Sequence, residues 1–210
     1  MAPALAPGEP LPRFGDRRRM RVGLLGGSFN PAHAGHLHVA RLARRRLGLD
    51  QVWLLVSPGN VLKPRAGMAP FADRLAAARA LADGRRVLAT GIEAALGTRY
   101  SIDTLRRLRQ RFPRVAFVWV MGADILQQLP RWRRWRELAA LAPFVVLPRP
   151  GYTARALAGQ AARRLHAARR SAGAAHRLAD AAPPAWTLLA VPLHPASASA
   201  IRAARKGAVP

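Results

Sequence analysis

The sequence predicts an α/β fold, with a doubly wound parallel sheet in a single domain, from three observations. Short apolar segments recur along the chain at intervals of roughly thirty residues, and their apolar residues are continuous rather than alternating. Continuous apolar strands are typical of a sheet that is covered by helices on both faces. Helical patterns separate these segments, and strands joined by helical crossovers run parallel. At 210 residues the chain can form one well-buried domain or at most two small ones, and no internal repeat suggests a second domain.

Six strands and three helices can be placed in order. A first helix repeats apolar residues over 37–47 and stops at Gly48, a second covers 71–83, and a third covers 101–112. Ser101 is suited to cap the third helix, and the first-turn Asp103 suits the helix dipole. The predicted strands are 21–25, 52–56, 86–90, 115–120, 144–147 and 186–191.

Two segments differ from this pattern. Residues 153–182 are almost all Ala, Arg and Leu, which predicts one or two exposed amphipathic helices. Residues 1–19 carry Pro, Gly and charge where a signal peptide needs an apolar core. We therefore interpret 1–19 as a flexible N-terminal extension and 20–210 as the folded domain, with Met20 as an alternative start.

Composition limits the compartment and the partners. No apolar run is long enough to span a bilayer. The absence of cysteine excludes disulfides, thiolate catalysis and cysteine zinc sites, and it fits a cytoplasmic protein. The formal net charge is +25, which suggests phosphate-bearing partners, either nucleotides or nucleic acid. The arginines are spread along the chain, which favours solvated helix faces over a nucleic-acid surface, and the oligomeric state is left undetermined.

The loop after the first predicted strand is the best-placed loop of the fold, because ligands bind beyond the carboxyl ends of parallel strands. It reads GGSFNPAHAGH over residues 26–36. Gly26 and Gly27 let the backbone approach a ligand closely, and the free N–H groups at the start of the next helix favour an anion. His33 and His36 add donors that can hold phosphate oxygens, and imidazolium charge would help as negative charge develops.

The loop has two other interpretations. A metal site is suggested by the closeness of His33, His36 and His38, but they lack the spacing of a helical zinc motif and no glutamate is nearby. A purely structural loop is the second alternative. The loop also lacks the GxxxxGK[ST] and GxGxxG spacings of other nucleotide-binding loops. Phosphate binding is the interpretation that we favour.

The tetrad His33–His36 resembles the HxGH signature of the nucleotidyltransferase superfamily, and its GGSFNP lead-in resembles bacterial nicotinate-nucleotide adenylyltransferases. Further segments resemble motifs of that family in the family's order, from about residue 20 to residue 205. They are VSPGNVLKP at 56–64, RYSIDTL at 99–105, VWVMGADIL at 118–126, PRWRRW at 130–135, VVLPRPGY at 145–152 and SASAIR at 197–202.

This resemblance implies a Rossmann-like fold and a reaction of NAD biosynthesis. Such an enzyme transfers the adenylyl group of ATP to nicotinate mononucleotide, giving deamido-NAD and pyrophosphate. The acceptor attacks the α-phosphate directly, so catalysis depends on positioning and charge stabilisation rather than on an enzyme nucleophile. Mg²⁺ would be carried mainly by the ATP phosphates and by water.

The resemblance also implies roles for individual residues. Ala198 replaces a serine of the family motif and cannot donate, so no role is assigned to it, whereas Ser199 keeps a hydroxyl. The alternatives are a helix cap for Asp124, an exposed loop position for Lys63 and core packing for Trp132 and Trp135. The implied residues are His33 and His36 for catalysis; Gly26, Gly27, Ser28, Phe29, Gly122, Asp124, Ser199 and Arg202 for ATP; and Lys63, Ser101, Thr104 and Trp132 for nicotinate mononucleotide.

Two alternative functions stay open at this point. One is an HxGH adenylyltransferase with another acceptor, either pantetheine phosphate or nicotinamide mononucleotide. The segments RYSIDTL and RWRRW favour nicotinate mononucleotide over these acceptors. The other is a non-catalytic RNA-binding protein on the same fold, which the basic charge favours and the intact HxGH tetrad disfavours.

Overall fold

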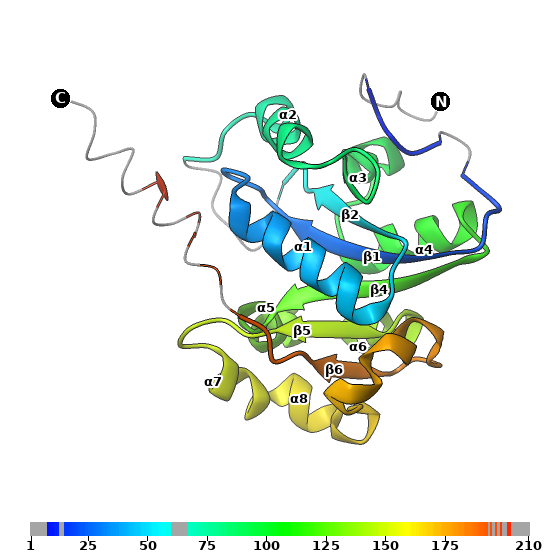
Figure 1. Ribbon diagram of the computed structural model, residues 1–210, viewed down its shortest axis with the longest axis vertical. Coiled ribbons are helices and arrows are strands. Elements are labelled where there is room, and N and C mark those ends of the chain that lie inside the picture. Colours follow the sequence, from blue (N-terminus) through cyan, green and yellow to red (C-terminus); the bar gives the residue numbers. More distant parts are fainter. Residues whose placement is uncertain are drawn as a thin grey trace.

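The computed structural model describes residues 8–12, 15–59, 67–192, 194, 196, 198, 201 and 202. Six strands form one sheet in the order β3-β2-β1-β4-β5-β6, and every neighbouring pair is parallel (Figure 1). The α/β fold class with a doubly wound parallel sheet is thereby confirmed. The strands are β1 Met20–Gly27, β2 Gln51–Val56, β3 Val87–Thr90, β4 Val115–Gly122, β5 Phe144–Leu147 and β6 Trp186–Leu188.

The strand order places a crevice between β1 and β4. The chain builds β1, β2 and β3 outward in one direction, then returns to the other side of β1 with β4 and continues to β6. In a doubly wound sheet, ligands bind beyond the carboxyl ends of the two strands where the order reverses. Those strands are β1 and β4, which end at Gly27 and Gly122. The GGSFNPAHAGH loop therefore leaves the sheet at the reversal.

Helices cover both faces of the sheet, as continuous apolar strands require (Figure 1). Successive residues of β1 belong to different cores, with Leu24 in one and Leu25 in the other. The core around Leu24 also receives α3 Ile92–Leu96, α4 Ser101–Arg111, α5 Ala123–Gln128, α6 Trp135–Leu141, α7 Thr153–Leu157 and α8 Gln160–Arg164. The core around Leu25 receives α1 Ala34–Leu47, α2 Phe71–Leu81 and the 3₁₀ helix η3 Ala172–Asp180.

Local sequence explains where the predicted helices begin and end. Gly48 takes a left-handed conformation (φ 62°) and its N–H donates to the carbonyl of Arg44, which ends α1 where the periodicity predicted. The cap predicted at Ser101 is wrong, because Ser101 is already the first residue of α4 and the N-cap is Tyr100, which makes no side-chain cap bond. Tyr100 is extended there (φ −116°, ψ 138°), so the chain enters α4 one residue earlier than predicted.

The prediction of one or two exposed amphipathic helices over 153–182 is also wrong. The segment is broken into α7, α8, the 3₁₀ helix η2 His166–Ala168 and η3. Gly159 interrupts the first helix in an extended conformation, and the segment is tied to β6, since Trp186 Nε1 donates to the carbonyl of Leu165 at 2.8 Å. Its inner side chains, mostly alanines, are buried against the core: Ala156, Ala161, Ala162, Ala175, Leu178 and Ala179.

Part of the predicted extension is packed against the domain. Leu11 is buried in the core. The carboxylate of Glu9 accepts hydrogen bonds from Thr90 Oγ1 and, at 3.0 Å, from the backbone N–H of Gly91. Residues 9 and 11 are thus packed against the domain, and the division into an extension over 1–19 and a domain from residue 20 stays a prediction.

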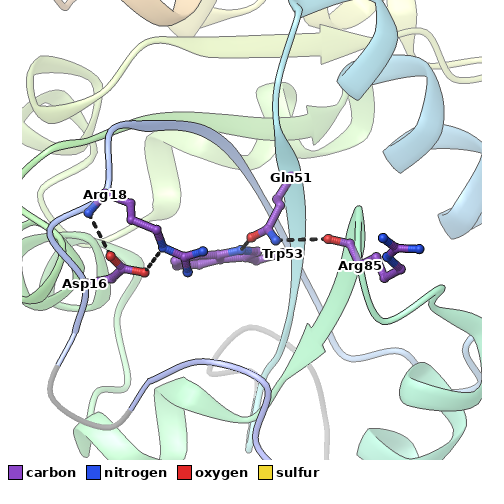
Figure 2. A network of polar contacts seen from close by, with 5 residues as sticks. All are labelled: Asp16, Arg18, Gln51, Trp53 and Arg85. Carbon is purple, nitrogen blue, oxygen red and sulfur yellow. Dashed lines mark hydrogen bonds and ion pairs between the residues drawn. The ribbon is translucent and has the colours of Figure 1, made fainter.

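Polar groups at the amino ends of the strands, opposite the reversal crevice, hold the chain before β1 and the start of β2. Asp16 and Arg18 form an ion pair, and the Trp53 indole donates to Gln51 at 3.0 Å (Figure 2). Gln51 in turn donates to the carbonyl of Arg85 at 2.9 Å, just before β3. This network lies at the amino ends of the strands, away from the reversal crevice. Among the helices of the described residues, none is long and apolar enough to cross a membrane.

Candidate active site

In the loop after β1, the aromatic ring of Phe29 folds back against the backbone of Gly27. Phe29 has a left-handed conformation (φ 49°), and its ring is buried against Gly27 and His36. A Cβ on Gly27 would lie 3.2 Å from the Phe29 ring, which is tighter than an ordinary contact. Gly27 therefore allows Phe29 to fold back, and Phe29 supports the ring of His36 at a centroid distance of 4.7 Å.

The two histidines of the tetrad lie against each other at the start of α1. Their ring centroids are 3.8 Å apart, and the backbone N–H of His33 donates to Nδ1 of His36 at 3.2 Å. Because Nδ1 of His36 accepts, the proton of its neutral ring is on Nε2, which makes Nε2 a donor. A Cβ on Gly35 would be 2.9 Å from the His33 ring and 2.9 Å from the carbonyl oxygen of Ala196, so only glycine fits between the histidines.

His33 is buried, and this changes its expected charge. Burial lowers the pKa of His33 below its usual value, and electrostatic repulsion from Arg149 and His194 lowers it further. The ring is therefore neutral at pH 7, and the imidazolium charge expected from the sequence does not apply to His33 in this state. Its Nδ1 atom is buried without a hydrogen-bond partner in the described part of the chain.

The carboxyl end of β4 supplies a second set of groups. Gly122 is the N-cap of α5, so the cap predicted as an alternative for Asp124 is not formed. Instead, Oδ1 of Asp124 is buried and lies 3.3 Å from Nε of Arg149, which follows β5. A Cβ on Gly122 would be 2.4 Å from that carboxylate, so the pair needs glycine at 122. Sequence reasoning missed Arg149, although it stands in the RPG segment that carried part of the family resemblance.

The end of the chain returns to the loop after β1. Arg202 donates from Nη1 to the carbonyl of Asn30 at 2.6 Å, although 172 positions separate these residues. His38 Nε2 lies 3.0 Å from the carbonyl of Pro192, which holds the same segment against α1. Arg202 therefore lies beside the loop after β1, and its role toward ATP stays a prediction. Ser199 lies outside the described residues, as does Lys63.

The residues predicted for the acceptor fall into two groups. Ser101 is partly exposed at the start of α4, and the partly buried Trp132 packs edge-on against Trp119 at 6.1 Å. Trp135 is buried in the core, as the packing alternative predicted. Thr104, in contrast, is fully buried, and its hydroxyl lies 2.8 Å from Oγ1 of Thr98. Thr104 therefore cannot contact a ligand as predicted in this state, because its hydroxyl is engaged inside the protein.

A basic cavity lies beside the start of α4. Its volume is about 670 Å³. The Arg133 guanidinium lies over the Tyr100 ring at 4.7 Å, and Arg106 is paired with Glu137 at 2.7 Å. The lining includes Thr98, Tyr100 and one acid, Asp103. It also includes four arginines: Arg99, Arg106, Arg107 and Arg133. Such a lining favours a ligand that carries several negative charges.

A buried arginine that the sequence did not reveal ties the loops together. Arg74 on α2 is only 3% exposed. Its guanidinium donates to the carbonyls of Ser28 at 2.6 Å, Ser57 at 2.8 Å, Ala69 at 2.9 Å and Pro58 at 3.4 Å. It therefore joins the loop after β1 to the loop after β2. Within the described ranges, no group of three or more His, Cys, Asp or Glu side chains could hold a metal ion.

Comparisons with known proteins agree with this geometry. Residues 24–204 match the cytidylyltransferase-like family. A "Probable nicotinate-nucleotide adenylyltransferase" of Gluconobacter oxydans is 58% identical over 183 residues, which cover 87% of this chain and 94% of that protein. A protein of the same name from Methylorubrum extorquens is 52% identical, with coverages of 87% and 99%.

The fold has relatives among solved structures as well. Nicotinic acid mononucleotide adenylyltransferase of Plasmodium falciparum, complexed with NaAD, matches with a TM-score of 0.64 at 15% identity, covering 88% of this chain and 83% of that one. At that identity the match supports the fold alone, and the membership rests on the sequence relatives. The chain therefore belongs to the cytidylyltransferase-like family and, within it, to the nicotinate-nucleotide adenylyltransferases.

Proposed function

We propose that this chain transfers the adenylyl group of ATP to nicotinate mononucleotide. A phosphate oxygen of the mononucleotide attacks the α-phosphorus of ATP, the bond from that phosphorus to the bridging oxygen breaks, and pyrophosphate leaves. The observation that carries the proposal is the pair of adjacent rings, His33 and His36, at the start of α1, beyond the reversal of the sheet. The relatives named above support the choice of reaction.

The donor loop, residues 26–36, is where ATP would bind. The backbone at Gly26 and Gly27 can approach the nucleotide, and the 14-residue helix α1 presents its positive end to the phosphates. His36 would donate from Nε2 to a phosphate oxygen. The negative charge of a triphosphate would raise the pKa of His33, so that this ring gains a proton where charge develops.

Further ATP contacts would come from distant parts of the chain. Arg202 already reaches the loop after β1, and Ser199 belongs to the same SASAIR segment. Ser28 and Phe29 lie in the donor loop, while Gly122 and Asp124 follow β4 and would face the adenosine. Arg149 would act on these groups through its ion pair with Asp124.

The acceptor segment, residues 97–101, is where nicotinate mononucleotide would bind. Ser101 would donate to the nicotinate carboxylate, and the Trp132 ring would pack against the pyridine. Lys63 would meet the mononucleotide phosphate. The arginines of the neighbouring cavity support an acceptor with both a carboxylate and a phosphate.

Mg²⁺ is part of the proposal, carried mainly by the ATP phosphates. The ion would neutralise phosphate charge, with phosphate oxygens and water as its main ligands. A cytoplasmic location is also proposed, because the reaction consumes ATP.

The test is release of pyrophosphate and formation of deamido-NAD by the purified chain with Mg²⁺ and ATP. Nicotinate mononucleotide, nicotinamide mononucleotide and pantetheine phosphate are supplied separately at equal concentrations. We expect nicotinate mononucleotide to give the highest kcat/KM. A folded protein with no product above the blank would refute the proposed reaction, and a higher kcat/KM for another acceptor would refute the proposed substrate. RNA binding that persists without activity would favour the non-catalytic alternative.

A further inference from the structure

A chain of hydrogen bonds runs from the first turn of α3 to the acceptor segment. Thr98 Oγ1 lies 2.8 Å from Thr104 Oγ1, which donates to Oε1 of Glu93 at 3.1 Å. A threonine hydroxyl has one proton. If Thr104 donates its proton to the Glu93 carboxyl group, Thr98 must be the donor in the bond to Thr104. Each donor in this chain then lies nearer the acceptor segment, and Glu93 is the final acceptor.

The same residues are also linked by bonds to backbone carbonyls. The N–H of Thr98 donates to the carbonyl of Glu93 at 3.1 Å. The carbonyl of Tyr100 accepts from the N–H of Thr104 at 3.0 Å and faces the Thr104 hydroxyl at 3.3 Å. Gly97, with φ 63°, turns the chain between α3 and this segment. The segment is therefore held from its inner side while its outer side lines the basic cavity.

Glu93 occupies a position where a carboxyl group is costly. Part of the residue reaches the surface, but protein atoms enclose its carboxyl group. This burial raises the pKa of Glu93 to about 7, and the bond from Thr104 opposes the rise. Among the described residues no ion pair compensates the carboxylate. An apolar side chain would avoid this cost but would remove the bond between Thr104 and α3, leaving the Thr104 hydroxyl only contacts with its own segment, such as the longer one to the Tyr100 carbonyl.

We propose that Glu93 is a positioning residue for the acceptor, because it fixes the segment 97–101 through Thr104 and Thr98. The inference rests on the proposed function, which places the acceptor on that segment. Glu93 does not touch the acceptor itself. Its loss should weaken acceptor binding while leaving the donor loop intact.

A nearby carboxylate provides a matched control. Glu9 also accepts from a threonine hydroxyl, that of Thr90, and it accepts from the N–H of Gly91, the N-cap of α3, at the end of the helix away from the acceptor segment. The variant Glu9→Gln therefore perturbs α3 without touching the acceptor segment. If Glu93 served only the stability of α3, variants at both positions would have the same kinetic effect.

The experiment compares Glu93→Ala, Glu93→Gln, Thr104→Val and Glu9→Gln at pH 6, where glutamine is the closest mimic of the protonated carboxyl. We expect Glu93→Ala and Thr104→Val to raise KM for nicotinate mononucleotide at least five-fold, with KM for ATP changed less than two-fold. Glu93→Gln keeps an acceptor for Thr104 and should restore KM to within two-fold. Equal changes in both KM values, no change, or the same change in Glu9→Gln would overturn the proposal.

Amide hydrogen exchange gives a readout that does not depend on activity. Exchange in peptides covering 97–101 should be at least ten-fold faster in Thr104→Val and Glu93→Ala than in the unchanged protein and Glu9→Gln. Thr104→Val decides the matter if Glu93→Ala does not fold. A wild-type chain that does not react with nicotinate mononucleotide would refute the proposed function alone, whereas unchanged exchange would refute the positioning role.

Discussion

Arg74 and Glu93 both hold loops at the carboxyl edge of the sheet, but with groups of opposite kind. Arg74 donates to four backbone carbonyls beside the donor loop, and its guanidinium stays charged at any physiological pH. Glu93 accepts from a hydroxyl beside the acceptor segment, and its carboxyl group titrates near neutrality. The donor side is thus held independently of pH, whereas the acceptor side is held by a group whose charge changes in the physiological range.

The largest expected effect comes from Arg74→Met. It leaves the carbonyls of Ser28, Ser57 and Ala69 without their donor inside the protein, and each unsatisfied buried group costs about 1–3 kcal/mol. We expect the free energy of unfolding to fall by roughly 3–5 kcal/mol, measured by urea denaturation. Arg74→Lys should recover only part of this loss, because one ammonium cannot reach four carbonyls.

The control is Arg45→Met, at an exposed position of α1. This change should alter the free energy of unfolding by no more than about 0.5 kcal/mol. If Arg74→Met changed the free energy of unfolding as little as Arg45→Met, other contacts would hold the loops after β1 and β2. Arg74 and Glu93 could then no longer be compared as the residues that hold the two sides of the site.

The second prediction distinguishes a residue that acts on the phosphates from one that stabilises the donor loop. His36→Ala removes a phosphate donor and the acceptor of one backbone N–H, that of His33. This structural loss is smaller than the loss of the four carbonyl contacts of Arg74, so kcat should fall by about 10²- to 10³-fold while the unfolding midpoint in urea changes much less than in Arg74→Met. Steady-state pyrophosphate release and urea denaturation measure the two quantities. Near-normal turnover in a folded His36→Ala variant would contradict the role of the tetrad.

These two residues also show what the sequence can and cannot predict. His36 was found because its loop follows a recognisable strand and opens a helix, and the strands were found because their apolar runs are continuous. Arg74 was missed because nothing local distinguishes it from the other arginines. Its burial depends on carbonyls from loops that only the fold brings together.

The acceptor side was predicted less well, for a related reason. The RYSIDTL motif points to Thr104 as an acceptor contact, although its neighbours Leu105 and Leu108 belong to the buried face of α4. That periodicity was visible in the sequence and indicated an inward position. The breaks in 153–182 could not be read in this way, because an Ala- and Arg-rich composition suits a continuous helix as well as the short pieces observed.

The third prediction concerns stability against pH on the acceptor side. The pKa of Glu93 is about 7 in the folded protein and near 4.5 when unfolded. The folded chain therefore binds more protons between these values, so its free energy of unfolding falls as the pH rises through this window. The contribution of Glu93 to that fall is at most about 3 kcal/mol.

Glu93→Gln should abolish this contribution. Urea denaturation at pH 5 and pH 8 should show the variant and the unchanged protein to be similar at pH 5, with the variant more stable at pH 8. The difference between the two proteins isolates Glu93 from all other titrating groups. Parallel behaviour at both pH values would show that the carboxyl group titrates normally.

The smallest expected effect is on the donor side, at the neutral histidine. Arg149 is one of two charges that lower the pKa of His33, but burial is the larger cause. Arg149→Met should therefore raise the pKa of His33, yet leave it below the value of an exposed histidine. NMR titration of the ring Cε1 proton measures this, with His33→Asn to assign the signal. A rise to the ordinary value would mean that charge rather than burial keeps His33 neutral, and an unchanged pKa would place Arg149 too far away to act. Either result would weaken the view that burial keeps His33 neutral in the free enzyme over the physiological pH range. In that view His33 takes up a proton only when the charge of a bound triphosphate raises its pKa.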